Sequence, residues 1–180
     1  MDRYHRLRSR EVYRNAWLAV QVHDVLHPSG VAGEHVALVT PPASAVVVMD
    51  GEHLVFTRQP RFAARDEFVE VVKGGAHEGE SALACAQREL REELGLAAAS
   101  WESLGAIYEI PSIVAHPVSL FLARELVPCS GEQEAVESIE PERLAIEAAF
   151  ALAAGGRILD AVTLAALLRF GLVTGRLRAT

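Results

Sequence analysis

The sequence predicts an α+β fold or an α/β sandwich, in which a few helices cover a β-sheet. Short runs rich in β-branched residues, separated by turn signals, recur over most of the chain and predict many strands. One helical pattern interrupts them early, at residues 79–94, and two more follow late, within residues 143–172. Many strands with few helices favour a sheet as the centre of the fold.

The N-terminal part of the chain predicts a small sheet of its own. Apolar and polar residues alternate over residues 12–30 clearly enough to favour one strand that ends in a Pro-Ser-Gly turn. Residues 34–40 are its expected hairpin partner. Two consecutive prolines then break the pattern. We therefore expect an N-terminal β region over residues 1–42 and a second domain over residues 43–180.

The second domain opens with the clearest hairpin signal in the chain. Two β-branched-rich runs within residues 44–59 flank Asp50 and Gly51, a dipeptide that favours two-residue hairpin turns. Residues 79–94 predict a helix that stops at Gly95, because glycine readily adopts the left-handed conformation at a helix end. Three further strands are predicted at residues 67–72, 102–110 and 118–126.

The C-terminal part begins with an acidic loop, residues 131–142, that leads into or out of a short strand. Two helices, separated by a Gly-Gly pair, are predicted over residues 143–156 and 159–172. Asp160 is the expected N-cap of the last helix, because its carboxylate can accept a hydrogen bond from a backbone N–H of the first helical turn.

Composition restricts the possible functions. The formal net charge is −7, which argues against non-specific binding to nucleic acid or to an anionic membrane. No apolar run approaches the ~20 residues of a membrane span, and the N-terminus lacks the apolar region of a signal peptide. Cys85 and Cys129 are the only cysteines, too few for a disulfide framework, so free thiols and a cytoplasmic location are expected.

The helix over residues 79–94 carries an unusual cluster of acids. Glu89, Glu92 and Glu93 share an arc of roughly 100° near its end, where the helix dipole disfavours negative charge. One interpretation is a solvated helix face. The unfavourable position instead favours a functional site, since converging carboxylates suit Mg²⁺ or Mn²⁺. The expected buried face occupies an adjacent arc of roughly 80° and consists of Leu83, Ala86, Leu90 and Leu94.

The same segment resembles a known family motif. From Gly74 the sequence reads Gly, five residues, Glu, seven residues, Arg-Glu-Leu, one residue, Glu-Glu, one residue, Gly-Leu, ending at Leu96. This resembles the Nudix box, G-x5-E-x7-R-E-U-x-E-E-x-G-U with U an apolar residue, at every fixed position. The resemblance implies a Nudix-type α/β/α sandwich with a mixed sheet, preceded by a small N-terminal antiparallel sheet. It also implies a hydrolase of a nucleoside diphosphate linked to another moiety.

The resemblance implies roles for the residues of the box. It implies bound Mg²⁺ or Mn²⁺ ions that would neutralise a pyrophosphate and activate a water molecule for in-line attack on phosphorus. Glu92 and Glu93 are the leading catalytic residues that it implies. Glu80 and Arg88 resemble the structural ion pair that orients the loop and the helix. The implied ligands of one to three Mg²⁺ or Mn²⁺ ions are Glu92 and Glu93, then Glu89, and the carbonyl oxygen of Gly74.

Residues outside the box resemble the ADP-ribose pyrophosphatase branch of the family. Residues 58–61 (RQPR) are similar to its R-Q-x-R motif, whose arginines can contact phosphates, and residues 70–74 are similar to its E-L-P-A-G stretch. Residues 1–42 resemble the N-terminal sheet that contributes to dimerisation and substrate contact, which implies a homodimer. The expected substrate-binding residues are Arg58, Arg61, Glu70 and Pro111.

Departures from that branch widen the range of substrates. Lys73 replaces a small residue, and together with Pro111 and Ser112 it resembles the ADP-compound hydrolases, which take ADP-ribose, NADH and diadenosine triphosphate. The leading expectation is cleavage of ADP-ribose to AMP and ribose 5-phosphate. The alternatives are hydrolysis of NADH, of a diadenosine polyphosphate or of an NDP-sugar such as GDP-mannose, removal of oxidised nucleotides, or a ligand sensor without catalysis.

The acidic loop supplies candidates for the general base. Glu134 and Glu137 match an E-x-U-E pattern that related enzymes use for a catalytic carboxylate. Glu137 is the first candidate and Glu134 the second. The alternative interpretation is a solvated loop.

Overall fold

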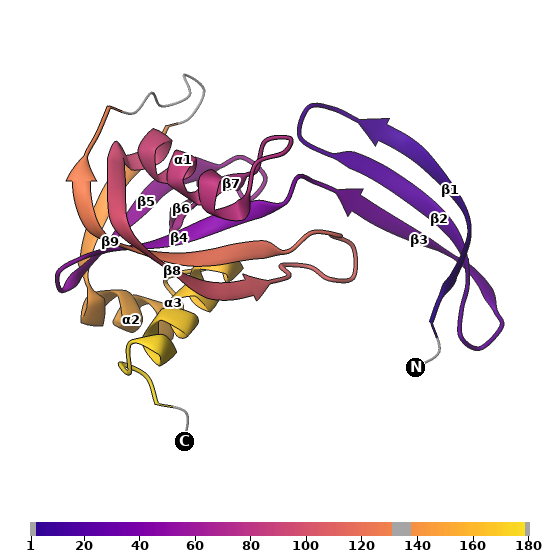
Figure 1. The fold of residues 1–180 in the computed structure, drawn as a ribbon. Coiled ribbons are helices and arrows are strands. Elements are labelled where there is room, and N and C mark those ends of the chain that lie inside the picture. The colour runs from indigo at the N-terminus through magenta and orange to yellow at the C-terminus, as the bar shows by residue number, and fades with distance from the viewer. Residues whose placement is uncertain (1–2, 131–137, 179–180) are drawn as a thin grey trace. The chain divides into compact units, whose positions relative to one another are not determined.

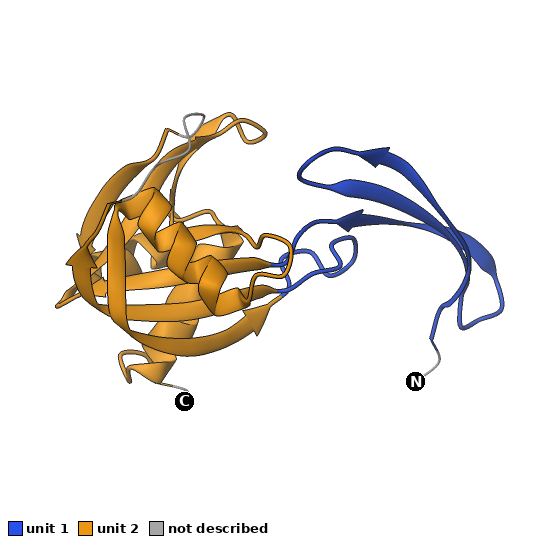
Figure 2. Cartoon of the chain, turned by 45° about the horizontal axis from the view of Figure 1, so that its top comes forward, with its two compact units in different colours: residues 1–42, 108–117 blue, residues 43–107, 118–180 orange. Residues whose placement is uncertain are grey.

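In the computed structural model, residues 3–130 and 138–178 are described, and the chain divides into two compact units (Figure 1, Figure 2). The first unit is Met1–Pro42 with Tyr108–Pro117, and the second is Ala43–Ile107 with Val118–Thr180. The first unit therefore contains a segment from far along the chain in addition to the N-terminal region. The backbone N–H of Leu38 donates to the Ile113 carbonyl (2.6 Å) and so attaches this segment to the N-terminal sheet.

The first unit contains a three-stranded antiparallel sheet in the order β1-β2-β3. The prediction of a single strand over residues 12–30 is wrong, because the Asn15 side chain accepts the N–H groups of Trp17 (2.9 Å) and Leu18 (2.8 Å) and closes a turn there. β1 is exposed at every position and lacks the alternation of apolar and polar residues that is typical of a strand. The strands are β1 (His5–Arg14), β2 (Ala19–Leu26) and β3 (Ala32–Val39).

The second unit is built on a mixed sheet of seven described strands. The main order is β10-β5-β4-β9-β8, with β6 paired to β5 and β7 paired to β4. β4 and β9 are parallel, and the other pairs are antiparallel. The strands are β4 (Ala43–Asp50), β5 (His53–Arg61), β6 (Asp66–Glu70), β7 (Val72–Gly75), β8 (Leu96–Ile107), β9 (Val118–Pro128) and β10 (Glu140–Ala145).

Helices cover both faces of this sheet, α1 (Ala82–Leu94) on one and α2 (Ile146–Ala154) with α3 (Ala161–Val173) on the other (Figure 1). The alternation of side chains along β4 produces this division. Val46 and Val48 belong to the core beneath α1, with Ala86 and Leu90. Ala45 and Val47 belong to the core beneath α2 and α3, with Phe170. The predicted α/β/α sandwich with a mixed sheet is confirmed.

Local signals determine where α1 lies. Ser81 is its N-cap and accepts the Ala84 N–H (3.2 Å), so the helix begins at Ala82, three residues after the predicted start at residue 79. Gly95 ends it with φ 62°, as predicted. The prediction that Leu83 lies on the buried face is wrong, because Leu83 is 39% exposed. Cys85, which was not predicted to lie on that face, is fully buried.

The two C-terminal helices follow the predictions with one change at a boundary. Asp160 caps α3 and accepts the Thr163 N–H (2.8 Å), as expected. α2 begins at Ile146 and not at residue 143, because Arg143 and Leu144 pair with β5 as part of β10. No helix in the described part of the chain combines the length and apolarity needed to cross a membrane.

Candidate active site

β7 and α1 bring the beginning and the end of the box motif together. Gly74 lies in β7 and pairs with Ser44 of β4. A Cβ built on Gly74 would lie 2.1 Å from Glu89 Oε1 and 2.5 Å from Glu89 Oε2. Glycine therefore leaves room here for the Glu89 carboxylate, which any side chain at position 74 would have to displace. The Gly74 carbonyl accepts a hydrogen bond from the Cys85 thiol (3.5 Å).

Arg88 is the centre of the acidic cluster on α1. Its Nε lies 3.1 Å from Glu80 Oε1, and one terminal nitrogen lies 2.8 Å from Glu89 Oε1 and 2.7 Å from Glu92 Oε2. The other terminal nitrogen donates to the Gly75 carbonyl (2.7 Å). Burial opposes the charge of Arg88, but the hydrogen bonds that it donates to Glu80 and Glu92 and the charge of Glu89 outweigh this effect and raise the pKa of Arg88.

The three box glutamates differ in exposure. Glu89 is 9% exposed and Glu93 5%, whereas the Glu92 side chain is 32% exposed. Carboxylates are rarely buried this deeply at the end of a helix, where the dipole opposes them. Three acids within two turns of α1, two of them buried, are therefore better explained by a cation-binding site than by a solvated face.

The donors around Gly74 fit a hard divalent cation. Carboxylate oxygens are the preferred ligands of Mg²⁺ and Mn²⁺, and the open space at Gly74 receives the carboxylate of Glu89. Within residues 3–130 and 138–178, no three His, Cys, Asp or Glu side chains converge into a ready-made metal cage. Arg88 instead binds Glu89 and Glu92. A divalent ion would compete with its guanidinium for the same oxygens.

A second charged cluster lies at the ends of β5 and β6. Arg61 Nε lies 3.2 and 3.1 Å from the two carboxylate oxygens of Glu70, and a terminal nitrogen of Arg61 also binds Glu70. Burial opposes the Arg61 charge, but the hydrogen bond and charge of Glu70, with smaller contributions from Glu93 and Asp160, raise its pKa. The electrostatic influence of Glu93 connects this cluster to the acids of α1.

The exposure of this second cluster decides what it can contact. The Glu70 side chain is only 3% exposed and is engaged by Arg61, whereas the Arg61 side chain is 39% exposed. Arg61 is therefore the member that faces outward. Arg58 is 41% exposed and binds Glu142 (2.5 Å), with Glu67 at 4.0 Å.

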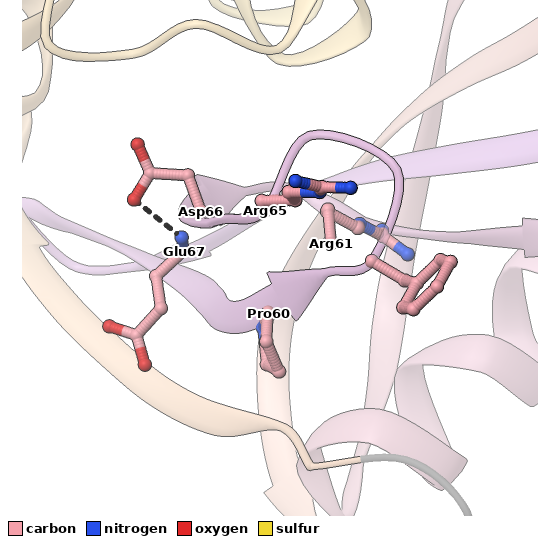
Figure 3. A pocket seen from close by; sticks show the side chains of 6 residues that line it. Pro60, Arg61, Arg65, Asp66 and Glu67 are labelled. Atoms are coloured by element: carbon pink, nitrogen blue, oxygen red, sulfur yellow. Dashed lines mark hydrogen bonds between the residues drawn. The ribbon is translucent and has the colours of Figure 1, made fainter.

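A pocket of about 410 Å³ lies at the turn of the β5–β6 hairpin. Figure 3 shows the guanidinium groups of Arg61 and Arg65 on one side of it and the carboxylates of Asp66 and Glu67 on the other. Phe62, also in its lining, is 98% exposed. Arg65 was not among the arginines predicted from the sequence to bind the substrate. The Arg-x-x-x-Arg spacing across a hairpin turn is the signal that could have found it.

The remaining predicted site residues lie elsewhere. Pro111 belongs to the first unit, where it lines a pocket of about 480 Å³ within that unit. The other side chains that line this pocket are Tyr4, Arg6, His23, Val25, His35 and Ser112. Glu134 and Glu137 lie outside the described residues.

Comparisons with known proteins agree with the box motif. A family model, the NUDIX domain, matches residues 39–161, which is more than half of the chain. A search of curated protein sequences finds no significant match. Among solved structures, that of an ADP compounds hydrolase has a TM-score of 0.85 and 23% sequence identity, over 98% of this chain and 97% of that one. At this identity the likeness shows a common fold. The family match shows that the chain belongs to the Nudix family and is a Nudix hydrolase.

Proposed function

We propose that the chain is a Mg²⁺-dependent pyrophosphohydrolase that cleaves ADP-ribose to AMP and ribose 5-phosphate. The observation that carries this proposal is the arrangement of Glu89 and Glu92 around Arg88, on the helix that also carries the buried Glu93, with Glu89 in the space left by Gly74. The printed name of the similar structure, an ADP compounds hydrolase, supports an ADP-containing substrate. Mn²⁺ is the alternative metal, and one to three ions are proposed.

The metal would be held by the carboxylates of Glu89, Glu92 and Glu93, with the Gly74 carbonyl oxygen as a further candidate. When bound, such ions neutralise a pyrophosphate and lower the pKa of water. Arg88 would balance part of the negative charge of this cluster through its ion pairs with Glu80, Glu89 and Glu92. Glu80 would in turn hold Arg88 in position.

Recognition of the diphosphate would come from the outward-facing arginines. Arg61 is oriented by three hydrogen bonds to the buried Glu70 carboxylate and still exposes 39% of its side chain. An arginine whose orientation is held in this way loses little entropy when it binds a phosphate. Arg58 is proposed as a second phosphate contact. Glu70 would act on the substrate through Arg61, and Pro111 is proposed as a further substrate-binding residue on the basis of the resemblance alone.

The general base is proposed to come from the acidic loop, with Glu137 first and Glu134 second. Their assignment rests on the E-x-U-E pattern. If both Glu137→Gln and Glu134→Gln keep a near-normal kcat, the base lies elsewhere.

We propose that the protein acts as a homodimer through its N-terminal β region. Every residue of β1 is exposed, and the large side chains of Leu7, Val12 and Tyr13 are more than half exposed. Apolar side chains in such numbers on one strand are typical of a surface that binds another protein copy. A monomer in light scattering at micromolar concentration would rule this out.

The decisive experiment is a Mg²⁺-dependent substrate panel with products identified by mass. The panel contains ADP-ribose, NADH, diadenosine triphosphate, GDP-mannose and 8-oxo-dGTP, with Glu93→Gln as the inactive control. AMP and ribose 5-phosphate from ADP-ribose would support the proposal. Faster turnover of NADH or diadenosine triphosphate would assign the chain to ADP-compound hydrolysis. No turnover of any member would favour a ligand sensor.

A further inference from the structure

Lys73 occupies an unusual position in β7, directly before Gly74. It is the only lysine among the 17 lysine and arginine residues of the chain, and its side chain is 17% exposed. Its Nζ lies 2.6 Å from Asp160 Oδ1 and 3.4 Å from Glu70 Oε2. An ammonium is compact and donates in three directions, unlike the planar guanidinium. The small ammonium group therefore binds two carboxylates at once, one buried (Glu70) and one partly buried (Asp160).

Asp160 has two separate roles at the N-terminus of α3. Its Oδ2 caps the helix by accepting the N–H (2.8 Å) and the hydroxyl (2.6 Å) of Thr163. Its Oδ1 binds Lys73. The Thr163 Oγ1 also accepts the backbone N–H of Val71 at 3.0 Å. The start of α3 is thus attached at two points to the three residues that precede Gly74.

The contacts of Glu70 extend this connection toward the acids of α1. Glu70 forms ion pairs with both Lys73 and Arg61, each through its Oε2, and the charge of Glu93 contributes to the raised pKa of Arg61. Four side chains of alternating charge, Asp160, Lys73, Glu70 and Arg61, therefore run from α3 to the region of Glu93. Removal of one member would leave a buried partner without its counter-charge.

We propose that Lys73 and Asp160 are positioning residues of the active site. Their ion pair fixes the β7 backbone against the start of α3, so that Gly74 stays opposite Glu89 and the metal-binding carboxylates keep their places. Neither side chain touches the metal or the substrate in this scheme. The inference rests on the proposed function only for the identity of the ion that the carboxylates bind.

The test compares the binding of Mn²⁺ to the full chain and its variants, measured by electron paramagnetic resonance without substrate. Asp160→Asn keeps an oxygen that can cap α3 but removes the charge that faces Lys73. Lys73→Met removes the cation and keeps an unbranched side chain. Arg143→Met is the matched control, since it removes the exposed pair with Asp50 at the opposite end of β4. Thermal unfolding of each variant without metal is recorded in parallel.

We expect Asp160→Asn and Lys73→Met each to weaken Mn²⁺ binding by about tenfold, the usual effect of losing a group that orients a metal ligand. The double variant should show no more than the loss of one single variant, because both act through one ion pair. Arg143→Met should bind Mn²⁺ like the parent. In kinetics, the Mg²⁺ concentration for half-maximal rate should rise similarly, whereas kcat at saturating Mg²⁺ should change less than twofold. A purely structural role would lower stability and leave the Mg²⁺ midpoint unchanged.

The inference would be overturned if folded Lys73→Met and Asp160→Asn bound Mn²⁺ within twofold of the parent, or if the losses of the two single variants added in the double variant. A parent that binds Mn²⁺ but hydrolyses no substrate in the panel would refute the proposed function, and the binding comparison would still decide on Lys73 and Asp160.

Discussion

The carboxylate of Glu89 occupies the space that a side chain at position 74 would fill, with Oε1 2.1 Å from the place of a Cβ on Gly74. The glycine of the box motif is thus explained by a contact between β7 and α1, and not by an unusual backbone angle. Lys73, its neighbour in the chain, is tied to α3 by Asp160 at 2.6 Å. Two neighbouring residues of β7 thus contact elements on opposite faces of the sheet, Gly74 the helix α1 and Lys73 the start of α3.

Gly74→Ala should weaken metal binding without unfolding the protein. The added methyl group must displace the Glu89 carboxylate, which is the movable end of a flexible side chain, so the free energy of unfolding should change by less than about 1 kcal/mol. We expect the Kd for Mn²⁺ to rise by about 10-fold to 100-fold. A Mn²⁺ titration and urea denaturation measure the two effects. An unchanged Kd would show that Glu89 does not bind metal.

Glu93→Gln should separate activity from stability. Loss of a metal-binding or proton-transferring carboxylate should lower kcat by about 10²-fold to 10⁴-fold. Without metal, the free energy of unfolding should change by less than about 1 kcal/mol, because relief of the helix dipole opposes the loss of the attraction to Arg61. Steady-state kinetics and urea denaturation measure both. Glu78→Gln, at an exposed position, is the matched control and should leave kcat unchanged.

Arg88→Met should destabilise the protein more than any substitution at an exposed arginine. It leaves Glu80, Glu89 and Glu92 without their common partner, and the Arg88 side chain is only 18% exposed. We expect a loss of about 2–3 kcal/mol in the free energy of unfolding, below the full value for a wholly buried pair. Millimolar Mg²⁺ should restore part of this loss, since the ion can replace the missing positive charge. Equal destabilisation by Arg143→Met would contradict this account.

The Asp160 carboxylate should make the stability of the chain depend on acid pH. Burial alone would raise its pKa, but Lys73 and the hydrogen bonds of Thr163 lower the pKa below the ordinary value of 3.8. A lowered pKa in the folded state gives stability that is fully present well above pH 3.8 and is lost as pH falls through the folded pKa.

The parent and Asp160→Asn should therefore differ in free energy of unfolding at pH 6 and converge as pH falls below 3.8. Urea denaturation across this range measures the difference. Asp66→Asn, at an exposed residue, is the control and should show a smaller pH-dependent difference. A gap between parent and Asp160→Asn that persists unchanged at low pH would mean that the substitution acts through packing or capping alone.

Local patterns in the sequence were sufficient for much of the fold. The glycine at the end of α1, the Asp50-Gly51 hairpin and the Asp160 cap were all predicted, and each depends on a conformation or hydrogen bond within a few residues. Helical periodicity likewise grouped Glu89, Glu92 and Glu93, because residues on one helix face share a surface whatever packs against it. The family of the chain also follows from the spacing within this single segment.

The tertiary structure alone decided which distant residues meet. β1 could not be predicted because its charged and exposed residues have no alternation, and only pairing with β2 makes it a strand. The pairing of Lys73 with Asp160 joins β7 to a helix 87 positions away. No local pattern encodes such a contact, since it depends on the order of strands in the sheet and on which face each helix covers. The sequence by itself thus determined the acidic helix and its family, whereas the tertiary structure brought Gly74 of β7 against Glu89 of α1 and joined Lys73 to Asp160 at the start of α3.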